Sequence, residues 1–267
     1  MTEILDDQLL EGFIHEFYGY GNYAGTYWFI GMEEGGGNKF KEIADRLNAW
    51  QKMGKHELED LEKYHVEIRR PYYFNDQAKL QPTWNKLIRI LLSSKNSVLK
   101  IEKEEVREYQ KMLLGRLNGE TCLVELLPLP SPSRNRWFYA QHSRLPYLTT
   151  REKYEQTLYP DRISHLRQRI NEYKPKVVIF YGSGYREYWK SIAKIDFSES
   201  HGISIGRSES TLFIITKHPS TKGITNEYFH QVGKIIKEVR GCSWDTISNS
   251  LVPTGGCSSK APPELRN

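Results

Sequence analysis

The chain of 267 residues has little cysteine: Cys122, Cys242 and Cys257 are its only three, and they are scattered. Three scattered thiols cannot form a disulfide framework or a metal knuckle. No run reaches the roughly 18 apolar residues of a membrane span. The first seven residues are acidic and lack a signal-peptide pattern. We therefore expect a cytoplasmic monomer that does not contact a membrane.

The sequence also lacks both glycine-rich nucleotide motifs, G-x-x-x-x-G-K-[ST] and G-x-G-x-x-G. It has instead Gly31-Met-Glu-Glu-Gly-Gly-Gly37, which follows an apolar run and precedes a helical pattern. The carboxylates of Glu33 and Glu34 would repel a phosphate, so this loop does not predict a nucleotide cradle. The plain alternative is a solvated turn with two exposed glutamates.

Aromatic residues are frequent, with 17 Tyr, 6 Trp and 10 Phe, and the net charge is +5. Two aromatic stretches, 69–74 and 134–139, interleave rings with arginines. Basic side chains reach phosphates and rings stack on unpaired bases, so the mixture suits a nucleic-acid surface. The alternative is that these rings line half-buried loops.

Four short apolar runs predict buried strands, at 26–30, 121–127, 176–181 and 211–216. They are nearly continuous in apolar residues, which is typical of a parallel sheet covered on both faces. Helical patterns lie before, between and after them, at 9–17, 39–52, 83–92, 104–117, 151–173, 185–193 and 227–239. This alternation predicts an α/β fold, a three-layer α/β/α sandwich around a central four-stranded parallel sheet.

We expect one domain over residues 1–242. Within it, the highly charged segment 54–79 shows little apolar periodicity and is predicted to be an insertion or a loop. Residues 243–267 form a tail rich in Ser, Gly and Pro.

Polar motifs follow three of the predicted strands: the glycine loop 31–37, the proline-rich segment 122–136, and His218-Pro219-Ser220 after the last strand. Their order and their strand-end placement resemble the uracil-DNA glycosylase superfamily. The resemblance spans roughly residues 25–240 and rests on short motifs. It implies a uracil-DNA glycosylase-like fold with DNA as partner, whether double-stranded with a flipped base or single-stranded. No metal and no organic cofactor is implied.

The resemblance also implies catalytic roles. Gly31 matches the first position of the superfamily's first motif, and Glu33 stands at its third, where the polar group that works on the attacking water is often found. Glu34 replaces the usual proline and could share or take over that role. A carboxylate suits the chemistry, because cleavage of an N-glycosidic bond builds positive charge on the sugar. His218, by resemblance, donates a hydrogen bond to the base oxygen as the base leaves.

Further positions follow for DNA and for the base. Ser220 and Lys222 are expected on phosphates. The later part of segment 122–136 resembles a proline-rich stretch of the superfamily that ends in Asn-Arg, and three of its residues are candidate DNA contacts: Arg134, Asn135 and Arg136. The candidates for contact with the flipped base are Met32, Tyr72, Tyr73, Phe74 and Glu125. Four cysteines hold an iron–sulfur cluster in some members, and this chain has too few.

Glu125 stands where several branches of the superfamily place an Asn that reads uracil. An ionised glutamate only accepts hydrogen bonds, so it should favour a base with an exocyclic amine, such as cytosine. The glycine run leaves room for a bulky 5-substituent, such as the hydroxymethyl or glucosyl groups of phage DNA. The plain alternative is that Glu125 pairs with an arginine at a strand end.

Taken together, the motifs predict a monofunctional DNA glycosylase that flips out a modified, cytosine-type base, hydrolyses its N-glycosidic bond and leaves an abasic site. A role in defence against modified phage DNA would fit that base preference. Three alternatives stay open: a non-catalytic reader of modified DNA, a conventional uracil-excising repair enzyme, and a small-molecule nucleosidase or other hydrolase.

Overall fold

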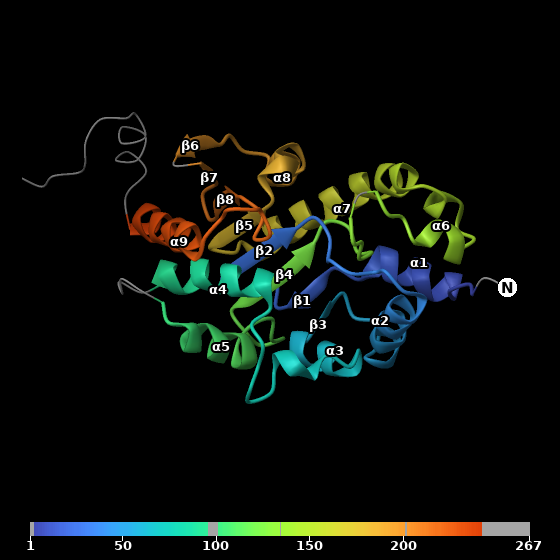
Figure 1. Ribbon diagram of the computed structural model, residues 1–267. Helices are drawn as coiled ribbons and strands as arrows, with labels where there is room; N and C mark the ends of the chain where they lie inside the picture. The colour runs from blue at the N-terminus through green and yellow to red at the C-terminus, as the bar shows by residue number, and fades with distance from the viewer. Residues whose placement is uncertain (1–2, 96–100, 134, 201, 242–267) are drawn as a thin grey trace, which may run out of the picture.

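The computed structural model describes residues 3–95, 101–133, 135–200 and 202–241 (Figure 1). It confirms the α/β class, with helices on both sides of one twisted sheet. Over the described residues the sheet has eight strands in the order β3-β1-β4-β2-β5-β8-β7-β6. The sheet is therefore larger than the expected four strands, and it is mixed rather than wholly parallel.

The four predicted strands form the middle of this sheet. They are β4 (Thr121–Glu125), β2 (Tyr27–Gly31), β5 (Val177–Tyr181) and β8 (Leu212–Thr216), and neighbours among them pair parallel. Nearly all of their residues are buried, as expected for strands covered on both faces. Parallel pairing brings their carboxyl ends to one edge of the sheet, where polar residues follow each strand.

Short strands that the sequence reading missed extend both edges. One edge gains β1 (Gly19–Gly21), antiparallel to β4, and β3 (Leu58–Glu59), parallel to β1. The other edge gains β7 (Ile203–Arg207) and β6 (Ser198–Ser200), both in antiparallel pairings. These strands have only two to five residues. Their apolar runs are too short to stand out from loop sequence.

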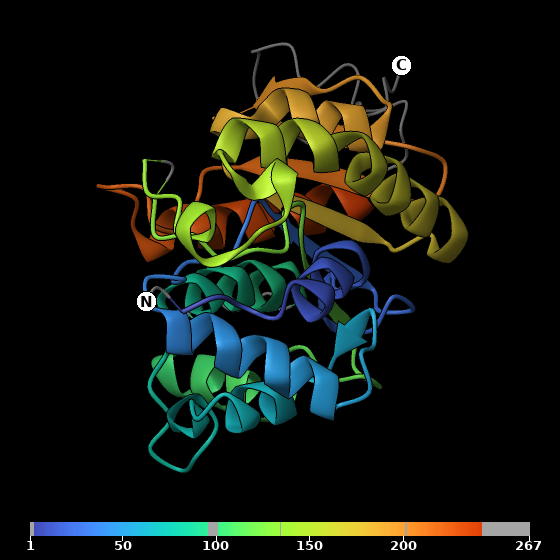
Figure 2. The same cartoon turned by 90° about the vertical axis from the view of Figure 1, so that its right-hand side faces the viewer.

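Helices cover both faces of the sheet (Figures 1 and 2). On one face α4 (Pro82–Lys95) packs along α9 (Asn226–Gly241), with α5 (Lys103–Met112) beside α4. On the other face α7 (Arg151–Tyr173) packs against α8 (Arg186–Ala193). The remaining helices are α1 (Asp7–Glu16), α2 (Phe40–Lys52), α3 (Leu61–Glu67) and the short α6 (Tyr139–His142).

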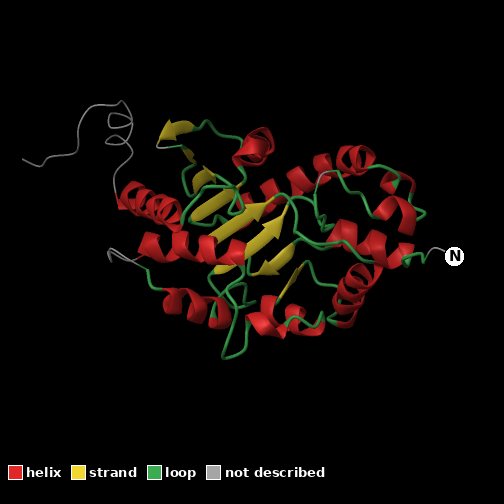
Figure 3. Ribbon diagram, in the orientation of Figure 1, coloured by secondary structure: helices red, strands yellow, loops and turns green. Residues whose placement is uncertain are grey.

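Segment 54–79 is more ordered than its charge suggested. It contains β3, α3 and a 3-10 turn at Pro71–Tyr73, and Figure 3 shows this alternation of helix, strand and loop. Leu61 and Tyr64 on α3 are fully buried, so the segment packs into the domain and is not only a loop. The expected tail at 243–267 lies outside the described residues.

Candidate functional site

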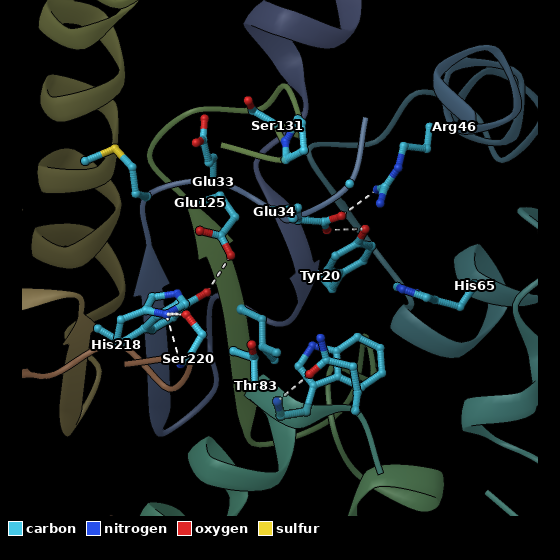
Figure 4. A pocket seen from close by; sticks show the side chains of 18 of the residues that line it. Tyr20, Glu33, Glu34, Arg46, His65, Thr83, Glu125, Ser131, His218 and Ser220 are labelled. Carbon is cyan, nitrogen blue, oxygen red and sulfur yellow. Dashed lines mark hydrogen bonds and ion pairs between the residues drawn. The ribbon is translucent and has the colours of Figure 1, made fainter. Parts of the chain in front are cut away.

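A cavity of about 730 Å³ lies at the carboxyl ends of β4, β2, β5 and β8 (Figure 4). Residues from the loop after β2, from the ends of β4 and β5 and from the segment after β8 line one part of it. The other part is lined by residues of α2, α3, the 3-10 turn after α3 and the start of α4. Ligand pockets of proteins commonly have volumes of roughly 300 to 1,000 Å³. The cavity is thus large enough for a ligand bigger than a bare pyrimidine.

Glu33 reaches the cavity from the loop after β2, and α7 supplies its cation. The Nη2 of Arg151 donates to Glu33 Oε2 at 2.6 Å, and both side chains are largely buried. The same guanidinium donates through Nε to Glu155. Glu33 is therefore not the exposed glutamate of a solvated turn; it is a carboxylate held in place by a buried arginine.

Glu34 has a different pair of partners. The hydroxyl of Tyr20 donates to Oε1 at 2.6 Å, and Arg46 on α2 donates to Oε2. Burial by itself would raise the pKa of Glu34, but the charge of Arg46, helped by His65 and the Tyr20 hydrogen bond, outweighs it and lowers that pKa. Glu34 is thus ionised, and it is bound on both oxygens to groups across the cavity.

Glu125, the last residue of β4, has no such cation. Its Oε1 accepts from the hydroxyl of Tyr181 at 2.5 Å, and its buried Oε2 has no hydrogen-bond partner among the described residues. Arg162 donates only to its backbone carbonyl, at 2.8 Å. Burial, reinforced by the nearby charges of Glu34 and Glu33, raises the pKa of Glu125 well above its usual range.

This environment corrects the premise of an ionised Glu125. A neutral carboxyl group both donates and accepts a hydrogen bond, as the amide of an asparagine does. Its charge therefore gives no reason to prefer cytosine over uracil. The alternative of an arginine partner is wrong as well, because no arginine bonds the carboxyl oxygens among the described residues.

His218 follows β8 and lies beside Tyr181, with ring centroids 5.6 Å apart. The backbone N–H of Ser220 donates to His218 Nδ1 at 3.1 Å, and the Ser220 hydroxyl lies 2.7 Å from the same nitrogen. An Nδ1 that accepts from an amide carries no hydrogen, so in the neutral ring the hydrogen sits on Nε2. Burial lowers the pKa of His218, which favours this neutral ring.

The opposite wall of the cavity combines rings and hydrogen-bonding groups. His65 donates from Nδ1 to the carbonyl of Leu61 at 2.8 Å, and burial lowers its pKa to about 4, so its Nε2 is an acceptor. Trp84 and Tyr73 pack together at 5.3 Å between ring centroids, and Trp84 also contacts the His65 ring edge-to-face. Thr83, at the start of α4, also lines the cavity (Figure 4).

The structure brings seven of the predicted site residues to this one cavity: Met32, Glu33, Glu34, Tyr73, Glu125, His218 and Ser220. Five others do not line it. Phe74 is buried in the core under Arg116, and Tyr72 is exposed outside the cavity. Asn135, Arg136 and Lys222 are exposed on loops. Arg134 lies outside the described residues.

Sequence reasoning missed several residues of the site, among them Tyr20, Arg46, His65, Thr83, Trp84, Arg151 and Tyr181. A tyrosine that ends the apolar run 176–181 was a usable signal, because the other central strands also end beside site residues. The buried cations carried no such signal, since Arg46 and Arg151 sit in charged helical stretches that read as solvated faces.

The interleaved aromatic and basic stretches turn out to be largely structural. Tyr139 is fully buried and donates to the carbonyl of Pro130, and Trp137 donates to the carbonyl of Leu148. Among the described residues of these two stretches, Arg70 and Tyr73 reach the cavity. For most of the rings the half-buried-loop interpretation is therefore the better one.

No protein-family model matches the chain, and no curated protein sequence matches it. None of the described helices has the length and apolar character needed to cross a bilayer. Within the described ranges, no group of three His, Cys, Asp or Glu side chains is arranged to hold a metal ion.

Proposed function

We propose that the chain is a monofunctional DNA glycosylase, which hydrolyses the N-glycosidic bond of a flipped-out modified base and leaves an abasic site. The observation that carries the proposal is the meeting of Glu33 and His218 in one cavity, although they are far apart in the sequence. An anion and a hydrogen-bond donor that face the same space can act on the two ends of the scissile bond.

Glu33 acts on the sugar side. As the bond between base and C1′ breaks, positive charge builds on the sugar, and a fixed carboxylate stabilises that charge. Arg151 holds this carboxylate in place and partly offsets its charge. Glu33 therefore works by its field and by orienting a water for attack on C1′. Glu34 is bound on both oxygens and acts as support for the loop.

His218 acts on the base side. Its neutral ring, with the hydrogen on Nε2, is a donor for the base oxygen that gains negative charge as the base leaves. Ser220 sets this tautomer through its backbone N–H. A ring fixed before the reaction needs no reorganisation during it, and that is the source of its catalytic effect.

Size, rather than charge, supports a bulky base. A bare pyrimidine leaves much of a cavity of about 730 Å³ unfilled. The wall of Thr83, His65, Tyr73 and Trp84 offers hydrogen-bonding groups and ring faces that a substituent on the base could contact. A cytosine with a hydroxymethyl or glucosyl group at C5, as in phage DNA, would use this space. The neutral carboxyl of Glu125 can meet the N3 and N4 edge of such a base with one donor and one acceptor.

Two observations favour other functions on the same site. The neutral carboxyl of Glu125 also fits the N3–H and O4 edge of uracil, which favours a uracil-excising enzyme. The ion pair that restrains Glu33 favours a reader that binds the modified base and does not cut.

Glu33→Gln separates cutting from reading, because it keeps the shape of the side chain and removes its charge. We expect the variant to release base about 10² to 10³ times more slowly in single-turnover assays and to bind the same DNA with the affinity of the wild type. Glu187→Gln, an exposed charge removal on α8, is the matched control. Equal base release by wild type and Glu33→Gln would contradict the proposed role. Binding of modified DNA without base release by wild type would identify a reader.

A further inference from the structure

Among the described residues, three carboxyl groups line the cavity, and their partners divide them into two kinds. Glu33 is bound by Arg151 and Glu34 by Arg46, so each has a buried cation. Glu125 has the hydroxyl of Tyr181 and no cation on its carboxyl oxygens among the described residues. Where environments separate carboxyl groups in this way, the unpaired one is the natural acid of the site.

The backbone around Glu125 strengthens the division. Arg162 is close, but its three hydrogen bonds go to the carbonyls of Phe17, Glu125 and Leu126. Its guanidinium also lies 3.5 Å from the ring centroid of Tyr18. Arg162 is thus committed to the backbone and to a ring, and it offers the Glu125 carboxyl no hydrogen bond.

We propose that Glu125 is the proton donor of this site: its carboxyl group gives a proton to the base as the bond between the base and the sugar breaks. The inference rests on the proposed function and adds a catalytic acid to it. Tyr181 is a positioning residue, because its hydroxyl holds Oε1 and leaves the carboxyl a restricted set of orientations.

In this step a water molecule replaces the base on C1′. The bond between C1′ and the base nitrogen breaks, and its electron pair stays with the base. The proton of Glu125 moves to a ring nitrogen or carbonyl oxygen of the base, which leaves neutral. The oxygen of a water forms the new bond to C1′, and one proton of that water passes to solvent. Glu125 then takes a proton back from solvent, so each turnover consumes one water.

A proton donor matters most for a cytosine-type base, because such a base is a poor anion and departs readily only when protonated. General acid catalysis of this kind typically contributes 10² to 10⁴ in rate. The groups that face Glu125 and bear on its proton are Glu33 and Glu34 after β2, Tyr181 on β5, Arg162 on α7 and His218 after β8. The two glutamates and the burial favour the protonated form.

The test compares wild type with Glu125→Gln, which keeps the shape and the hydrogen-bonding ability but has no acidic proton. Single-turnover base release is measured across pH 5 to 10 on duplex oligonucleotides that carry cytosine, 5-hydroxymethylcytosine, its glucosylated form or uracil. We expect the rate of the wild type to fall on the basic side, as Glu125 loses its proton. We expect Glu125→Gln to be about 10² to 10⁴ times slower at pH 7, to lack that basic limb and to bind DNA as tightly as wild type.

A second measurement does not depend on catalysis. Infrared difference spectra between wild type and Glu125→Gln at pH 7 should show the carbonyl band of a protonated carboxyl in the wild type. Absence of that band, or base release by Glu125→Gln within about threefold of wild type, overturns the inference and leaves the glycosylase function standing. Failure of wild type to release base from any of the four DNAs overturns the function and this inference together.

Discussion

The carboxyl of Glu125, at the end of β4, and the hydroxyl of Tyr181, at the end of β5, meet over Gly31, the last residue of β2, which lies between these two strands. Gly31 pairs with Glu125 in the β2–β4 ladder, and an added Cβ on it would overlap both Glu125 Oε2 and the Tyr181 hydroxyl. β4 and β5 are not neighbours, so only a residue without a side chain at this point of β2 lets the two groups touch. The position of the Glu125 carboxyl thus depends on Gly31, because the absence of a side chain there leaves room for it.

Gly31→Ala is the direct test of this arrangement. The methyl group must displace either Glu125 or Tyr181, so we expect a loss of about 1 to 3 kcal/mol in the free energy of unfolding, with a loss of base release. Chemical denaturation measures the first quantity. Gly184→Ala is the control, because a Cβ there meets nothing within 4 Å. Equal stability of the Gly31 and Gly184 variants would show that the contact between the Glu125 carboxyl and the Tyr181 hydroxyl does not require a glycine at residue 31.

The protonation of Glu125 also predicts a dependence of stability on pH. The folded protein keeps the proton to higher pH than the unfolded chain, because the folded-state pKa is raised. The stabilising contribution is therefore complete below the unfolded pKa and is lost as pH rises through the folded one. Glu125→Gln has no proton to lose. We expect its melting temperature, relative to wild type, to rise steadily from pH 4 upwards, and a pH-independent difference would be inconsistent with a neutral Glu125.

His218 and Ser220 are expected to differ in the size of their effects. His218→Phe keeps a ring and removes the donor, so base release should fall by about 10² to 10³. Ser220→Ala should cost less than tenfold, because the backbone N–H of residue 220 still donates to Nδ1. Nitrogen NMR provides a check: the His218 ring should carry its hydrogen on Nε2 at pH 7 and should titrate below its ordinary value of 6.5. A ring protonated on Nδ1 would remove the proposed donor.

The pair of Glu34 and Arg46 makes a prediction about stability alone. Arg46→Met leaves a carboxylate without its buried cation, and we expect unfolding by urea to show a loss of about 3 kcal/mol at pH 7. The loss should shrink towards pH 4, as Glu34 takes up a proton. The double variant Glu34→Gln, Arg46→Met should recover part of the loss, because the uncompensated charge is gone. An additive double variant would show that the two groups do not interact.

Much of the fold could be predicted from the sequence. The four central strands are dense apolar runs that follow from burial on both faces, and α7 begins and ends at the predicted residues 151 and 173. The edge strands and α3 could not be predicted. β1 is Gly19-Tyr20-Gly21, which pairs only because β4 is beside it, and the charged residues of α3 obscure its buried Leu61 and Tyr64.

The candidate site divides in the same way. Glu33, Glu125 and His218 could be located because each lies within or shortly after a predicted apolar run, and parallel strands bring the residues at their carboxyl ends to one edge. The charge state of Glu125 could not be predicted. It depends on which glutamates the arginines of α2 and α7 reach, and the sequence does not show that Arg46 binds Glu34 and Arg151 binds Glu33 while Glu125 is left without a cation.

The most direct test of the central claim is mass spectrometry of free bases released by the purified protein from DNAs that contain cytosine, 5-hydroxymethylcytosine, glucosylated 5-hydroxymethylcytosine or uracil. We expect release of a 5-substituted cytosine, with an abasic site left in the strand, and loss of that release in Glu33→Gln. Release of uracil alone would contradict the proposed base. Release of no base from any of these DNAs would contradict the proposed chemistry.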